Sequence, residues 1–221
     1  MSQLNLSNDE LLSTTRAVRK RLDFDREVPR PLIDECMNLA LQAPSGSNAQ
    51  GWQFMFVNDK DKIAKIGELY RVAFAGYAAS DMAASKQHAD DPSMHDTQQR
   101  VQTSAQYLAD NMHRVPLMML PCYMGRLEAV PTAMMNASQA GTLGSIIPAA
   151  WSFMLAARAR GLGTCWTTLH LNHEKEIAEI LGIPYDSVTQ VALIPVGYTK
   201  GTDFKVAPRK PLETVVHFNQ W

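Results

Sequence analysis

Helical and strand patterns interleave along the whole chain, but the strands are few. Runs of strand length occupy about four stretches, residues 52–59, 115–124, 161–171 and 187–199, and the helical stretches between them differ in length. A doubly wound nucleotide-binding fold would place a GxGxxG motif after its first strand, and the sequence has none. We therefore predict a layered α+β domain.

Three local signals make this prediction more specific. Ser7 and Glu10 form a capping-box pattern at the start of a first helix. Pro116 and Pro121 restrict the strand that contains them to a mixed or edge position. Residues 145–160 are apolar almost all round, which predicts a buried helix, and residues 124–145 are expected to form a long connection before it.

The composition limits the class of protein. The chain has 221 residues, 46% of them hydrophobic, and a formal net charge of −1, so we expect one domain over residues 1–221 and neither a nucleic-acid nor a membrane partner. Three widely spaced cysteines without a CxxC pair argue against disulfides and a zinc site. The N-terminus has no leader pattern, and no run of about 18 apolar residues occurs, so we predict a cytoplasmic protein.

Two basic segments are candidate anion-binding sites. Arg16 and Arg19 lie three residues apart in TTRAVRKR, a spacing that allows both forked guanidinium groups to meet on one phosphate. Arg209 lies near the C-terminus in PRKPL. Charge runs are usually solvated surface, so a solvated turn and a solvated tail are the alternative interpretations.

Two further segments combine small residues with polar groups. In APSGSNAQGWQF, residues 43–54, the small residues let backbone approach a flat ligand, while Ser45, Ser47, Asn48 and Gln50 offer hydrogen bonds to its edge. In GLGTCWTTLHL, a glycine turn leads to polar groups that face a ring edge in the same way, Trp166, Thr167 and Thr168. A capped loop and a helix C-cap are the alternative interpretations.

No set of side chains for covalent catalysis or metal binding is visible. The sequence shows no nucleophilic triad, and His170 and His173 have no third ligand candidate nearby. Cys165 is expected to pack in the core, because no neighbour in the sequence would lower the pKa of its thiol. We predict no catalytic side chain and no metal site.

Taken in order, these four segments resemble the nitroreductase family of FMN-dependent oxidoreductases, from about residue 13 to residue 212. The family's RRSVR-like segment corresponds to TRAVR at residues 15–19, and its APSGSNxQPW to APSGSNAQGW at residues 43–52. Its GLGxxW turn corresponds to GLGTCW at residues 161–166, and its C-terminal arginine to Arg209. Each motif is short, but the ordered set is specific.

The resemblance implies a homodimer, intertwined and with FMN at the interface, whose central sheet is mostly antiparallel or mixed and flanked by helices. It assigns to the FMN phosphate the residues Arg16, Ala17, Val18, Arg19 and Arg209. Thr15 and Ala17 stand where many relatives carry an arginine and a serine, so two donors to the phosphate are missing. We therefore expect weaker FMN binding.

The resemblance also assigns residues to the flavin ring. Pro44, Ser45 and Gly46 would lie along its plane, often on the flavin held by the other subunit, with Asn48 near the ring edge. The reactive portion would be bordered by Trp166, Thr167 and Thr168. Gly51 replaces the family's proline before Trp52.

The function implied by the resemblance is reduction of an electron-poor organic acceptor, a nitroaromatic, a quinone or similar, by NADPH or NADH in a ping-pong hydride transfer through FMN. Acceptor choice is assigned to residues 77–115, a variable helical excursion, and to residues 124–145. The tail, residues 204–221, is expected to extend onto the partner subunit. The alternatives are a dehalogenase or flavin-consuming enzyme of the same fold, and a non-enzymatic flavin-binding module.

Overall fold

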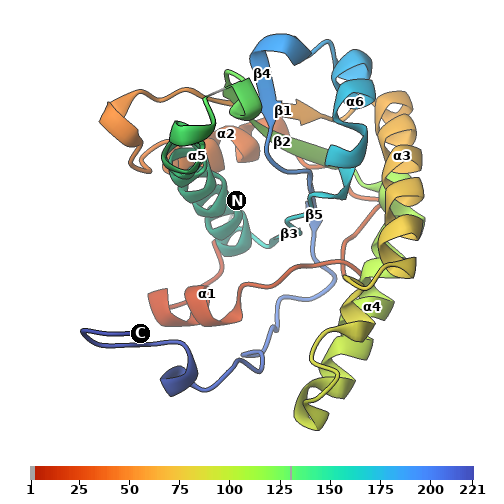
Figure 1. Ribbon diagram of the computed structural model, residues 1–221. Helices are drawn as coiled ribbons and strands as arrows, with labels where there is room; N and C mark the ends of the chain where they lie inside the picture. The colour runs from red at the N-terminus through yellow and green to blue at the C-terminus, as the bar shows by residue number, and fades with distance from the viewer. Residues whose placement is uncertain (1–2, 130) are drawn as a thin grey trace.

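The computed structural model describes residues 3–129 and 131–221, and its helices and strands alternate along the chain (Figure 1). The helices are α1 (Asn8–Thr14), α2 (Arg30–Ala40), α3 (Lys60–Ala79), α4 (Pro92–Asn111), α5 (Met135–Ala159) and α6 (Glu174–Leu181). The strands are β1 (Trp52–Val57), β2 (Leu117–Met124), β3 (Leu162–Thr164), β4 (Val188–Gln190) and β5 (Ile194–Tyr198). The predicted α+β class is confirmed. The capping box of α1 is also present, with the Glu10 N–H donating to the Ser7 hydroxyl.

The strands form one antiparallel sheet in the order β1-β2-β5-β3, with β4 also paired to β2. The prediction of a mixed or edge position for β2 was wrong, because β2 lies inside the sheet and all its strand partners are antiparallel. Pro121 is tolerated there because the register of β2 changes partner around it, from β5 at residues 117–119 to β4 at residues 122–124. Its carbonyl accepts the Val191 N–H, so the missing proline donor falls in that gap.

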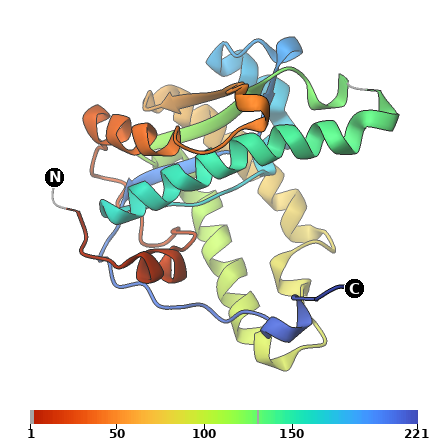
Figure 2. The same cartoon turned by 90° about the vertical axis from the view of Figure 1, so that its left-hand side faces the viewer.

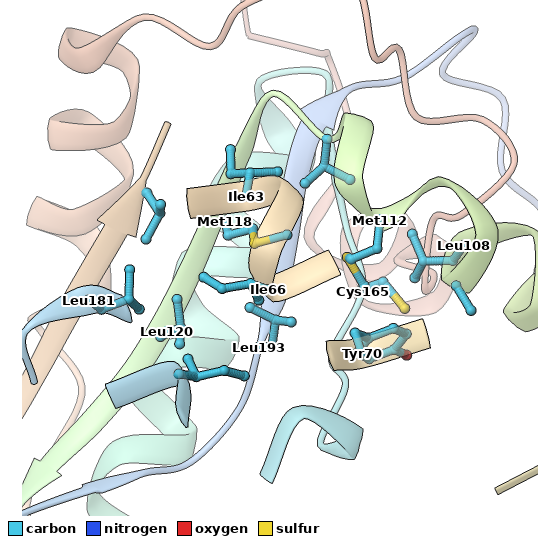
Figure 3. Packing of buried hydrophobic residues seen from close by; sticks show 14 of the residues in the cluster. Ile63, Ile66, Tyr70, Leu108, Met112, Met118, Leu120, Cys165, Leu181 and Leu193 are labelled. Carbon is cyan, nitrogen blue, oxygen red and sulfur yellow. The ribbon is translucent and has the colours of Figure 1, made fainter. Parts of the chain in front are cut away.

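The side chains of β2 alternate between two hydrophobic layers, as the period of a strand requires. Met118, Leu120 and Cys122 join the cluster formed with α3, α4 and α6, part of which Figure 3 shows around Ile66 and Leu193. Leu117 and Met119 join the cluster formed with α2 and α5. The sheet therefore lies between α3, α4 and α6 on one face and α2 and α5 on the other.

Helix α5 is longer than predicted. It begins at Met135, within the stretch that was expected to be a connection, and it contains Pro148. The first turns are rich in small and polar residues and carry no apolar stripe, so hydrophobic periodicity did not reveal them. By length and composition alone Thr132–Ala159 is apolar enough to cross a membrane, but 44% of its most apolar window is buried, as in a core helix. Val130, in the expected connection, lies outside the described residues.

Two parts of the chain extend away from the sheet. Residues 77–115 include the end of α3, a 3-10 turn at Ala84–Lys86 and α4, which Figure 1 shows below and to one side of the sheet. The tail after β5 crosses beneath α1 (Figures 1 and 2). The tail has no strand and leaves apolar side chains exposed, among them Val206, Leu212, Val215, Phe218 and Trp221.

Candidate functional site

The TRAVR segment, residues 15–19, is an extended chain that docks on β3. The Val18 N–H donates to the Thr164 carbonyl at 2.8 Å, and Ala17 forms an isolated parallel bridge with Thr164. This approach requires glycine at position 163, because a Cβ there would lie 2.7 Å from Thr199 Cγ2 and 2.8 Å from Val18 Cβ. The GLGTCW glycine therefore serves to seat the arginine segment.

Arg16 lies at the start of the tail, near enough to Arg209 for the two charges to interact. Arg16 donates to the carbonyls of Ser13, Thr15 and Lys205, and the last of these bonds joins it to the tail. Partial burial, and then the charge of Arg209, lower the pKa of the Arg16 guanidinium. Within the described part of the chain neither arginine has an acidic partner. Two guanidinium groups without an acidic partner in this part of the chain are candidates for binding an anion.

Arg19 has a different set of neighbours. It donates to the Ser104 hydroxyl on α4 at 3.3 Å. It also lies beside the Cys165 thiol, whose pKa is raised by burial against the opposing effect of Arg19. The expected convergence of Arg19 with Arg16 on one anion is not seen in the single chain. Arg19 instead faces the GLGTCWTT segment.

Tyr70 completes this second group. Burial raises the pKa of its hydroxyl, and contacts with Thr167 and Arg19 act in the opposite direction. Thr167 is held firmly, since its N–H and its hydroxyl both donate to the Leu193 carbonyl, at 3.1 and 2.8 Å. Thr168 is exposed, whereas Trp166 and Thr167 are half-buried.

The APSGSNAQGW loop is strained and locked. Ser47, Asn48 and Gln50 have φ values of 54°, 53° and 48°, a left-handed conformation that side chains rarely adopt. The Gly46 N–H donates to the Ser145 hydroxyl at 3.0 Å, and the Gln50 amide donates to the Asn48 side-chain oxygen at 3.0 Å. Several strained residues in one exposed loop are typical of a binding site rather than of a connecting turn.

The departure at position 51 has a structural explanation. A Cβ at Gly51 would lie 2.7 Å from Cζ of Tyr123, because the tyrosine ring packs over the glycine. The tyrosine therefore occupies the space next to the backbone where relatives carry proline.

One chain does not bring all the predicted residues together. The loop that contains Pro44, Ser45, Gly46 and Asn48 lies on one side of α5, and α1 and the tail with Arg209 lie on the other (Figures 1 and 2). The charge of Arg209 acts on Arg16, whereas Arg19 and Thr167 both act on Tyr70.

Sequence patterns missed several supporting residues. Ser145 holds the small-residue loop, Tyr70 contacts Thr167, and Ser104 contacts Arg19. Each of these contacts joins residues that are far apart in the sequence. No local spacing signals such contacts.

Within the described part of the chain, no group of three His, Cys, Asp or Glu side chains is placed to hold a metal ion. His170 is fully buried and has no hydrogen-bond partner, and burial lowers its pKa to about 3.

One antiparallel sheet between two helical layers, with the small-residue loop and the arginine segment outside it, is the architecture of the nitroreductase-like α+β class that the sequence motifs predicted. The sequence pattern of the nitroreductase family matches residues 12–198. The chain belongs to the nitroreductase family, which confirms the predicted class of an FMN- and NAD(P)H-dependent oxidoreductase.

Similar proteins agree with this assignment. An archaeal protein from Methanothermobacter thermautotrophicus, provisionally named NADH dehydrogenase/NAD(P)H nitroreductase, is 24% identical over 191 residues, 86% of this chain and 75% of its own. A BluB-like flavoprotein from Clostridium difficile superposes with a TM-score of 0.70 at 19% identity, over 98% of this chain and 100% of that one. Iodotyrosine deiodinase bound to FMN and 3-iodo-L-tyrosine gives 0.67 at 20% identity, over 96% and 98%.

Proposed function

We propose that the chain binds FMN, its phosphate between Arg16 and Arg209, and reduces an electron-poor organic acceptor with NADPH or NADH. The observation that carries this proposal is the Arg16–Arg209 pair, two adjacent guanidinium groups without an acidic partner. A dianionic phosphate would remove their repulsion, and each charge-assisted hydrogen bond would contribute about 1.5–3 kcal/mol. The donor set therefore fits the cofactor of the family.

FMN, when bound, supplies the redox chemistry, a ping-pong exchange in which NAD(P)H gives a hydride and leaves before the acceptor takes one. The side chains bind and orient. Arg16 and Arg209 hold the phosphate, and Ala17 and Val18 supply the docked backbone between Arg16 and Arg19. Arg19, because it lies beside Cys165 in the GLGTCWTT segment, serves the ring end of the cofactor rather than the phosphate. No side chain acts as a covalent catalyst.

The Trp166, Thr167 and Thr168 segment is proposed to border the reactive part of the ring. The Thr167 N–H and hydroxyl already bond Leu193, so they fix the segment rather than contact the ring. Thr168, exposed beside them, is the side chain available to the ligand. The positive charge of Arg19 nearby would stabilise negative charge that develops on a reduced ring.

We propose that the single domain of residues 1–221 assembles as a homodimer. The loop of Pro44, Ser45, Gly46 and Asn48 lies across α5 from Arg16 and Arg209, so it would reach the flavin of the partner. The apolar side chains of residues 204–221 are exposed in the single chain. Edge strand β1 borders a groove of about 610 Å³ whose lining combines apolar side chains such as Phe54 with polar ones such as Arg30, and this groove suits a partner's tail.

Acceptor choice is proposed to depend on residues 77–115 and 124–145. Ser104, in the first region, contacts Arg19, so the excursion borders the proposed ring end.

The compartment we propose is the cytoplasm, because Cys36, Cys122 and Cys165 are free and buried, as a reducing environment allows.

The reaction class is tested by separating the two half-reactions under argon. Protein loaded with FMN is mixed first with NADPH or NADH, and after full bleaching with a nitroaromatic, a quinone, an iodinated phenol or oxygen. Rapid reoxidation by the nitroaromatic or quinone supports the proposal. Halide release supports the dehalogenase alternative, loss of flavin with oxygen supports the flavin-consuming one, and bound FMN that neither nucleotide bleaches indicates a binding module.

A further inference from the structure

Two guanidinium groups lie against one aromatic ring at the point where the tail leaves the fold. The guanidinium carbon of Arg21 is 4.3 Å from the centroid of Phe204, and that of Arg158 is 4.8 Å from the same centroid. Both distances are within the range of cation–π attraction. Phe204 is therefore held by two cations, from the segment after TRAVR and from the end of α5.

The same two arginines hold the backbone that leads up to Phe204. Arg21 donates to the carbonyls of Lys200 and Asp203, and it forms a 2.6 Å ion pair with the Asp203 carboxylate. Arg158 donates to the Thr202 carbonyl at 2.9 Å. Residues 200–204 have no strand pairing, so these bonds and the ring contact replace a sheet ladder.

Burial of Arg158 at this position costs free energy of folding. Its side chain is 3% exposed, and its Nε and Nη1 atoms are buried without a hydrogen-bond partner. Burial, and then the charge of Arg21, lower its pKa. A buried cation without a carboxylate partner lowers the stability of a fold. Arg158 is therefore a candidate for a role other than stabilisation.

The position that these contacts fix is that of the phosphate site. The residue after Phe204 is Lys205, whose carbonyl accepts the Arg16 guanidinium, and Arg209 follows four residues later. We infer that Arg21 and Arg158 clamp Phe204, and that this clamp places Arg16 and Arg209 for the FMN phosphate. This inference rests on the proposed function. Arg21, Arg158 and Phe204 are positioning residues and do not touch the cofactor.

The test compares FMN with riboflavin, which has the same ring and no phosphate. Dissociation constants for both ligands are measured by flavin fluorescence with the flavin-free protein, for the wild type, Phe204→Leu and Phe204→Trp. Phe204→Leu keeps an apolar group but removes both cation–π contacts, so the preference for FMN over riboflavin should fall about tenfold. Phe204→Trp keeps an aromatic face and should retain the preference.

A general loss of folding would weaken both ligands equally, so the ratio isolates positioning from stability. A Phe204→Leu protein with the wild-type ratio overturns the clamp. A wild type that binds both ligands equally, or neither, overturns the phosphate assignment instead. If Phe204→Leu does not fold, Arg21→Met, at a partly exposed position, removes one of the two contacts and must lower the same ratio.

Discussion

The hydroxyl of Ser145 on α5 accepts the N–H of Gly46, 99 positions earlier in the chain, at 3.0 Å, and donates to the Gly141 carbonyl at 2.8 Å. This bond links the strained loop of Ser47, Asn48 and Gln50 to the core helix. Ser145 is almost completely buried, so the link does not compete with water. The loop conformation is therefore set by α5 and not by its own turn residues alone.

Removal of this hydroxyl should loosen the loop while the fold survives. We expect Ser145→Ala to reduce the free energy of unfolding by about 1 kcal/mol, the usual net value of one hydrogen bond, and to weaken flavin binding. Urea unfolding and FMN titration measure the two effects. Ser187→Ala is the matched control, because its exposed hydroxyl bonds only the nearby Pro184 carbonyl. Equal flavin affinity in both variants would mean that the loop does not contribute to flavin binding.

The phosphate site is tested by charge removal. Arg16→Ala and Arg209→Ala should each weaken FMN by about one to two orders of magnitude, because each removes a charge-assisted hydrogen bond worth about 1.5–3 kcal/mol. Riboflavin affinity should stay unchanged. Arg71→Ala, which removes an exposed guanidinium paired with Glu68, is the control and should have no effect. Loss of riboflavin binding to the same extent would mean that the two arginines do not hold the phosphate.

Gly163 should not accept a side chain. A methyl group would meet Val18 Cβ at 2.8 Å, near its backbone, so Gly163→Ala must push the TRAVR segment off β3. We expect a loss of about 1–3 kcal/mol in the free energy of unfolding and reduced FMN binding. Gly76→Ala on α3 has open space around it and should be neutral or stabilising by up to about 1 kcal/mol. Similar denaturation midpoints for the two variants would contradict the close approach.

Buried His170 predicts sensitivity to acid. Its pKa is lowered from 6.5 to about 3, so the unfolded chain takes up a proton below pH 6.5 that the folded chain refuses. The contribution of neutral His170 to the free energy of unfolding is therefore full above pH 6.5. It falls by about 1.4 kcal/mol per pH unit as the pH decreases toward 3. His170→Leu should flatten this slope, and His88→Leu, at an exposed position, should not. Urea midpoints from pH 7 to pH 4 test the difference, and parallel slopes for wild type and His170→Leu would refute it.

Much of the fold was predictable from local patterns. The capping box at Ser7 and the apolar strand that begins at Trp52 are short-range signals, and the structure contains both. The interior position of β2 was not predictable, because Pro121 is tolerated through a change of strand partners that only the assembled sheet shows. The early start of α5 was missed because small residues carry no apolar stripe.

The sequence indicated single candidate residues of the site, but it did not indicate which of them lie together in the fold. The motifs indicated Arg16, Arg19 and Arg209 as candidates. In the structure Arg19 lies beside Cys165, whereas the charge of Arg209 acts on Arg16. Ser145 and Phe204 had no sequence signal, since their contacts are long-range.

FMN binding is tested most directly by the visible absorption spectrum of the protein after incubation with FMN and removal of free ligand by gel filtration. We predict a yellow protein with stoichiometric FMN, bleached by NADPH or NADH under argon. A colourless protein after FMN addition would contradict the account.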